Sequence, residues 1–245
     1  MPDIPAAVQT LERDLREVFG ARVQSLVAYG LHTHEAEHHH AAHGHGRRPL
    51  VHTLAVVETI GHDDLRACAA HIEAWHDAGL ATPLVLAAGE IARSLDAFPF
   101  EFSAILADHA VVSGRNPFEG LSVNAADLRR ACEVEARGHL LHLRQGFVET
   151  RGRGDALAAL IVRSAPAWAS LLQNVARLQG LSSHDPAAAG RHVERALNLT
   201  GGAEDIAKLT LVREISSENA LRLFPAYLDA AERLTKYVDD WSAGQ

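Results

Sequence analysis

The sequence predicts an α+β protein, in which a small mixed sheet with helices packed on it is followed by an all-helical bundle. Up to about residue 106, short aliphatic runs alternate with helical patterns, and glycine or proline bounds most of them. Beyond residue 120, apolar residues recur only at helical spacing. With 245 residues, 47% of them hydrophobic, the chain is long enough for two domains with buried cores.

The first domain is expected to cover residues 1–118. It opens with a helix that has Val8, Leu11 and Leu15 on one face and stops at Gly20. The expected order is helix, strand, strand, helix, strand, helix, strand, at residues 5–19, 23–29, 50–57, 62–78, 82–87, 89–95 and 98–106. Residues 108–114 are expected to form the turn after the last strand.

The second domain is expected to cover residues 119–245, because residues 113–120 are dense in turn formers. Asn124 and Ser217 are expected to cap helices, and Asp185-Pro186 marks another helix start. Glycines at 152–154, 180 and 201–202 separate the amphipathic segments. Four or five such helices predict a bundle.

Bulk properties exclude several function classes. The formal charge is −8 and no large Lys/Arg cluster occurs, so we expect no nucleic-acid partner. We read no signal peptide and no run of membrane-spanning length, so a cytoplasmic, bacterial-type protein without a membrane partner is expected. Cys68 and Cys132, the two cysteines, fall on apolar helical faces and are expected to be buried thiols.

A histidine-rich loop, residues 31–49, separates the first two expected strands. Together with the start of the second strand it holds eight of the chain's sixteen histidines: His32, His34, His38, His39, His40, His43, His45 and His52. Imidazole suits Zn²⁺ or Ni²⁺ rather than Mg²⁺, and Glu35 or Glu37 could complete a tetrahedral site. The sequence therefore predicts affinity for a transition metal. The alternative is a tract that binds metals only adventitiously.

Several short motifs carry a family resemblance. They are Ser25-Leu-Val-Ala-Tyr-Gly30, Leu54-Ala-Val-Val57, Phe98–Leu106, Asp108–Gly114 and Leu128–Arg144. On them, residues 10–180 resemble the nucleotidyltransferase-domain superfamily, specifically bacterial proteins with a nucleotidyltransferase-like domain before a helical bundle. The resemblance implies a nucleotide cleft beside the turn at Gly30.

The chain departs from that family where its chemistry resides. Leu31 stands where the family has a serine after glycine, and Val51 and Thr53 stand at its acidic positions. The third carboxylate position, on the strand expected at 98–106, falls on Ser103 or Ala104. Mg²⁺ requires hard oxygen ligands. We therefore expect a pseudoenzyme: no catalytic residue carries over, and a magnesium–nucleotide complex is not expected to bind in the family's manner.

The candidate residues of the implied nucleotide pocket are Tyr29, Gly30, Glu101, Asp108, Arg137 and Arg144. For the two arginines the alternative is a charged helix face, with Glu133 and Arg137 paired at i,i+4. Asp108-His109 is either a carboxylate-oriented imidazole or a capping or solvated pair.

Three functions remain open at this point. The preferred one is a nucleotidyltransferase-like protein that has lost magnesium-dependent transfer and binds a transition metal through its histidines. The second is an active transferase with relocated ligands among Glu35, Glu37, Glu58, Glu101 and Asp108. The third is a metal buffer or regulatory binding protein. A small-molecule or nucleotide ligand is compatible with all three, as is a homodimer or protein partner through the helical domain.

Overall fold

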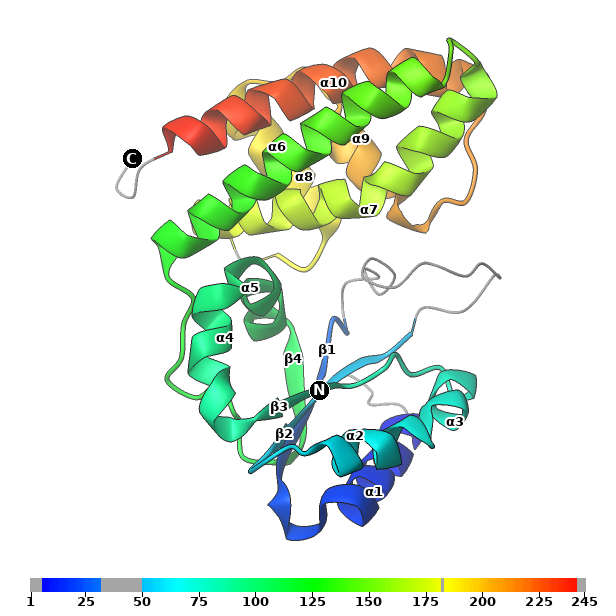
Figure 1. The fold of residues 1–245 in the computed structure, drawn as a ribbon. Helices are drawn as coiled ribbons and strands as arrows, with labels where there is room; N and C mark the ends of the chain where they lie inside the picture. The colour runs from blue at the N-terminus through cyan, green and yellow to red at the C-terminus, as the bar shows by residue number, and fades with distance from the viewer. Residues whose placement is uncertain (1–5, 32–49, 182, 242–245) are drawn as a thin grey trace. The chain divides into compact units, whose positions relative to one another are not determined.

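A computed structural model describes residues 6–31, 50–181 and 183–241 of the chain. These form two compact units, Met1–Val123 and Asn124–Gln245. The first unit holds a sheet with helices on both faces, and the second is all helical (Figure 1). The α+β class expected from the sequence is confirmed.

The sheet has four strands in the order β3-β2-β1-β4. They are β1 (Val23–Tyr29), β2 (His52–Val57), β3 (Leu84–Ala87) and β4 (His109–Gly114). β1 pairs antiparallel with β2 and β4, and β2 pairs parallel with β3. Gly114 ends β4 at φ +80°, so close to the Gln24 and Ser25 backbone that an added Cβ would overlap it. Only glycine fits there.

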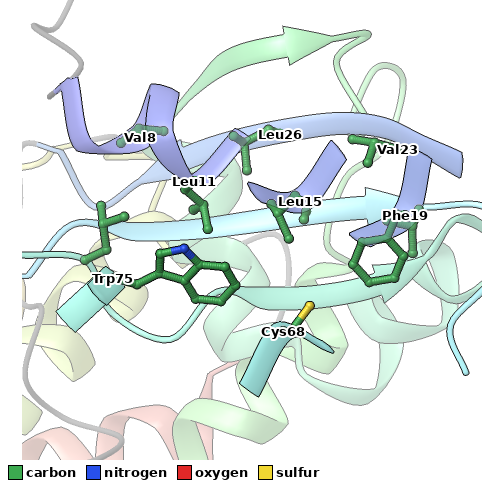
Figure 2. Packing of buried hydrophobic residues seen from close by; sticks show 11 residues of the cluster. Val8, Leu11, Leu15, Phe19, Val23, Leu26, Cys68 and Trp75 are labelled. Atoms are coloured by element: carbon green, nitrogen blue, oxygen red, sulfur yellow. The ribbon is translucent and has the colours of Figure 1, made fainter. Parts of the chain in front are cut away.

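One face of the sheet is covered by α1 (Ala6–Phe19), α2 (His62–Ala69) and α3 (Ile72–Asp77). Val8, Leu11 and Leu15 of α1 are fully buried, as their helical spacing predicts. They point toward Trp75 and the strands in Figure 2. The Trp75 indole N–H donates to Asp14 at 2.8 Å. Residues 62–78, expected as one helix, form α2 and α3 with a turn between them.

The opposite face is covered by α4 (Ile91–Ala97) and α5 (Pro99–Ala107), whose Phe102 and Ile105 pack on Val27 and Leu54 of the sheet. The strand expected at residues 98–106 is therefore wrong. A short apolar run reads equally as a buried strand or a buried helix, and Pro99 occupies the first helical position, where proline favours a helix. The last strand is instead β4, in the segment expected to be a turn.

The helical unit contains α6 (Ala125–Glu149), α7 (Gly154–Leu178), α8 (Pro186–Leu197), α9 (Ala203–Ala207) and α10 (Ser217–Asp240). α6, α7 and α10 pack on one another, and α7 also contacts α8 and α9. The Asn124 side chain accepts hydrogen bonds from the first turn of α6, and Asp185 caps α8. The cap predicted at Asn124 and the helix start predicted at Asp185-Pro186 are confirmed. The cap predicted at Ser217 is wrong by one residue, because the Ser216 side chain accepts from the Asn219 N–H and Ser217 is the first residue of α10.

Among the described helices, α7 alone is long and apolar enough to cross a membrane by length and composition. Its apolar side chains have protein partners, since Leu157, Ile161, Trp168 and Leu172 are buried in the bundle. The apolar character of α7 is that of a core helix. The two cysteines, Cys68 and Cys132, are buried free thiols, as predicted.

Candidate functional site

The candidate site lies where β1 ends and β2 and β4 begin. Tyr29, the last residue of β1, stands directly opposite His52 of β2 and His109 of β4. Directly opposed residues of antiparallel strands point to the same face of a sheet. Two imidazoles and one phenol therefore form a single row, which we call the His52–Tyr29–His109 row.

Tyr29 packs against His52 with ring centroids 5.5 Å apart. Burial raises the pKa of the Tyr29 phenol to about 12, so this group is neutral at physiological pH. Gly30 follows at φ +65°, and its N–H donates to the Asp108 carbonyl at 2.9 Å. This bond fixes the end of β1 against the start of β4.

His109 is held in one orientation by the backbone. Its Nδ1 lies 3.1 Å from the carbonyl oxygens of Ile105 and Leu106, and its ring meets Phe118 edge-on with centroids 5.1 Å apart. Because carbonyl oxygens only accept, Nδ1 carries a proton, and in the neutral imidazole Nε2 is the ring atom with a lone pair. A carbonyl-oriented imidazole of this kind is suited to bind a metal or accept a proton.

The opposite face of the same sheet end carries small side chains. Thr53 of β2 stands opposite Ala28, which in turn stands opposite Ala110 of β4. Thr53 is 1% exposed, and its hydroxyl has no hydrogen-bond partner among the described residues. Val51 packs into the core cluster beneath α1. The two positions at which the resemblance expects carboxylates are thus apolar or hydroxylic.

Of the five acidic residues considered as relocated ligands, Glu35 and Glu37 lie outside the described residues, and the other three lie in different places. Asp108 is buried at the start of β4, Glu101 is in the first turn of α5, and Glu58 follows the far end of β2. The six residues of β2 separate Glu58 from the site by roughly 15–20 Å. Within residues 6–31, 50–181 and 183–241, no group of three His, Cys, Asp or Glu side chains is placed to hold a metal ion.

Seven of the predicted metal ligands lie outside the described residues. They are His32, His34, His38, His39, His40, His43 and His45. The eighth, His52, opens β2 within the site. Thiolate ligands are disfavoured, because burial raises the pKa of Cys132 to about 12 and also raises that of Cys68.

Arg137 and Arg144 lie on α6 and bind acidic residues of α10. Arg137 contacts Asp239 at 2.6 Å and Glu133 at 3.4 Å, and Arg144 contacts Glu232 at 2.7 Å. These contacts agree with the alternative reading, in which both arginines belong to a charged helix face. Both arginines belong to the helical unit, whereas Tyr29, Gly30, Glu101 and Asp108 belong to the first.

The sequence named Tyr29, Gly30, His52 and Asp108, which the structure brings to one sheet end. It considered His109 only as the neighbour of Asp108 and did not include it among the pocket or metal-binding candidates, and it expected β4 to be a turn. The signal was present: His109-Ala-Val-Val-Ser113 is a short aliphatic run closed by Gly114, a pattern typical of a strand.

No protein-family model matches this sequence, and no curated protein matches it. The chain is similar to the crystal structure of the spectinomycin adenyltransferase AAD(9) from Enterococcus faecialis with ATP and spectinomycin. The TM-score is 0.56 at 11% sequence identity, over 93% of this chain and 98% of that chain. This likeness shows the fold alone: the chain has a nucleotidyltransferase-like fold.

Proposed function

We propose that this nucleotidyltransferase-fold protein does not carry out magnesium-dependent nucleotidyl transfer. The observation that carries the proposal is the sheet end itself, where Val51 and Thr53 stand at the positions that the resemblance marks as acidic. Transfer to an acceptor requires divalent ions held by carboxylates on the attacking and leaving oxygens. Valine cannot ligate, and one neutral hydroxyl does not replace two negative charges.

The second part of the proposal is that imidazole replaces carboxylate as the working ligand. Support comes from the sequence, in which seven histidines lie between residues 32 and 45, directly before His52. Support also comes from His109, whose protonated Nδ1 leaves Nε2 as a donor atom at the same sheet end. Zn²⁺ or Ni²⁺ fits such ligands.

We propose that the protein works in a bacterial cytoplasm. We also propose that its ligand is a small molecule or a nucleotide. The net charge of −8 argues against a nucleic-acid partner, since phosphate binding requires a basic face. A metal-buffering or regulatory role is a form of the same proposal in which the fold serves as scaffold.

The experiment compares metal content and transfer in untagged protein. We expect elemental analysis to find Zn²⁺ or Ni²⁺, and we expect no labelling of any acceptor from ATP or CTP with Mg²⁺. A variant with asparagine at the seven histidines between 32 and 45 should lose the metal but stay folded. The matched control carries asparagine at His62, His76 and His192, exposed or half-buried histidines elsewhere, and should keep it. Robust transfer by the wild type would refute the proposal.

An active transferase with relocated ligands is favoured by one observation, the placement of Asp108. Asp108 is 4% exposed, and its backbone carbonyl accepts a hydrogen bond from the Gly30 N–H. If this alternative holds, ATP with Mg²⁺ binds in calorimetry and Asp108→Asn or Glu101→Ala abolishes the binding. If our proposal holds, the wild type and both variants all show no binding of ATP with Mg²⁺.

A further inference from the structure

An apolar stripe runs along the outer face of α6. Val134, Leu141 and Val148 are 68%, 63% and 75% exposed. They are spaced by seven residues, or close to two helical turns, so they align on one side of the helix. The opposite side packs into the bundle through residues such as Cys132, Leu140 and Leu143. Large aliphatic side chains that are exposed and aligned on one helix face are typical of an interaction surface.

The rest of this outer face completes a heptad pattern. Ala131, Gly138 and Gln145 repeat at the same interval, three residues before each member of the stripe. A Cβ added at Gly138 would meet nothing within 4 Å, so the face is open at its centre. In coiled-coil terms the stripe occupies the d positions, and the small or amide residues occupy the a positions. Small residues at a let a second helix approach closely.

The two flanks of the stripe carry opposite charge. Arg130, Arg137 and Arg144 occupy the three g positions on one flank. Glu135, His142 and Glu149 occupy the e positions on the other. In two-stranded coiled coils these positions select the partner and its orientation.

The arginine flank lies toward α10, because Arg137 contacts Asp239 and Arg144 contacts Glu232. Arg130 binds Asp127 on α6 itself. The three arginine side chains nevertheless remain 69%, 54% and 52% exposed in chain order. A guanidinium has five N–H donors, so each arginine can keep its present partner and also donate to a second carboxylate. On the other flank, Glu149 accepts from Gln145 at 3.3 Å and is exposed.

We propose that the outer face of α6 binds a second copy of this chain, with the two α6 helices parallel. In this register Val134, Leu141 and Val148 meet the same residues of the second copy. Arg130 then faces Glu135 of the second copy, and Arg144 faces its Glu149, each pair occurring twice by symmetry. The inference is independent of the proposed function and adds an assembly to it.

The charges on the two flanks favour a parallel second copy over other binding partners. In an antiparallel pair, arginines would face arginines and glutamates would face glutamates, so like charges would repel along both flanks. An anionic membrane would attract the arginine flank but repel Glu135 and Glu149 on the other. A parallel copy of the same helix matches both flanks at once.

The first test is sedimentation velocity of the full-length protein from low micromolar to several hundred micromolar. We expect a reversible dimer, and we expect Leu141→Glu to raise its dissociation constant by more than about tenfold, since it places two facing carboxylates in the seam. The matched control is Leu65→Glu, which alters an exposed leucine of α2 and should dimerise like the wild type. Circular dichroism checks that both variants fold. A wild type that stays monomeric throughout, or an equal effect of both variants, overturns the proposal.

The second test determines the orientation through single cysteines. In a parallel pair, Val134→Cys and Val148→Cys should each form a disulfide-linked dimer on mild oxidation. In an antiparallel pair centred on Leu141, only a mixture of the two variants would crosslink, which would overturn the register. The native Cys68 and Cys132 are buried, so they do not compete. Leu65→Cys, the exposed control, should stay uncrosslinked.

Discussion

Hydroxyl groups on the helices of the second unit and on the strands of the first differ in their hydrogen bonding. In the helical unit, Thr150, Ser164 and Thr235 each donate to a backbone carbonyl, at 2.7, 3.0 and 2.8 Å. In the sheet unit, the Ser25 and Thr53 hydroxyls are buried without a partner among the described residues. The same chemical group is therefore internally satisfied in one region and unsatisfied in the other.

Backbone geometry explains this difference. A helical serine or threonine reaches the carbonyl three or four residues earlier, as Thr235 reaches Ala231. On a strand the neighbouring carbonyls are occupied by the ladder and lie in the sheet plane, away from the side chain. A strand hydroxyl needs a partner from elsewhere. The three helical hydroxyls are therefore satisfied within their own helices, whereas the two strand hydroxyls, Ser25 and Thr53, have no partner among the described residues.

The largest expected effect on stability concerns His139, a half-buried histidine of the helical unit. His139 Nε2 lies 2.7 Å from the Tyr227 hydroxyl, and its ring stacks on Trp168. The Tyr227 hydroxyl donates to Ser164 at 3.1 Å. Burial, together with the nearby charge of His142, lowers the pKa of His139 from 6.5 to about 4. The unfolded chain therefore binds a proton that the folded chain excludes.

Below pH 6.5 this difference should weaken the fold. Stability falls as pH falls wherever the unfolded state binds more protons, by about 1.4 kcal/mol per pH unit for one group. We expect urea midpoints to drop steadily from pH 6.5 toward 4, with a total near 3 kcal/mol from this residue. His139→Gln should flatten the slope, and the exposed His142→Gln, which removes only the smaller of the two causes, should flatten it far less. An unchanged slope in His139→Gln would contradict a neutral His139 in the folded protein.

The next largest effect on stability is expected from removing the Tyr227 hydroxyl. Tyr227→Phe keeps the ring but leaves the His139 N–H without an acceptor, so we expect a loss of about 1–3 kcal/mol in the free energy of unfolding. Chemical denaturation at neutral pH measures it. Phe224→Leu changes a neighbouring core side chain without touching this polar chain, so a double-mutant cycle with His139→Gln should show coupling for Tyr227→Phe only.

A matched pair of substitutions tests the comparison between the units directly. Thr235→Val removes a hydroxyl that donates within its helix, so we expect a loss of about 1 kcal/mol. Thr53→Val removes a hydroxyl without a partner among the described residues, so we expect no loss, or a gain of up to about 1 kcal/mol. If both variants lose stability equally in urea denaturation, the Thr53 hydroxyl is satisfied in the folded protein and the contrast disappears.

The smallest effect concerns the arginines of α6. Arg137→Ala and Arg144→Ala each remove an exposed ion pair with α10, which is worth less than about 1 kcal/mol. The midpoint temperature of thermal denaturation should fall by a few degrees at most. A loss of ligand binding in these variants, with stability kept, would instead assign them to a nucleotide pocket.

Much of the fold was predictable because local signals and burial agreed. The buried face of α1, the cap at Asn124 and the Asp185-Pro186 start all follow from residue spacing and capping chemistry. The interpretation failed at residues 98–106, where a continuous apolar run has no period that separates a buried strand from a buried helix. Because α5 was expected to be the last strand, the segment that forms β4 was expected to be a turn.

The candidate site was predictable only in part. Tyr29 and Gly30 follow from a strand that ends in glycine, and His52 follows from the strand after the histidine loop. The role of His109 depends on β4 pairing beside β1, a long-range contact that sequence periodicity does not encode. The apolar stripe on α6 and its charged flanks can be read in the sequence, but their exposure cannot, because the packing of α7 and α10 decides which face stays open.

The most direct test of the central claim is a calorimetric titration of the untagged protein with ATP in the presence of Mg²⁺, beside one with Zn²⁺. We predict no saturable binding of the magnesium–nucleotide complex and clear binding of Zn²⁺, lost when the seven histidines between 32 and 45 are replaced. Micromolar binding of ATP with Mg²⁺ that disappears in Asp108→Asn would contradict the account, since it would mean that a carboxylate site persists beside Gly30.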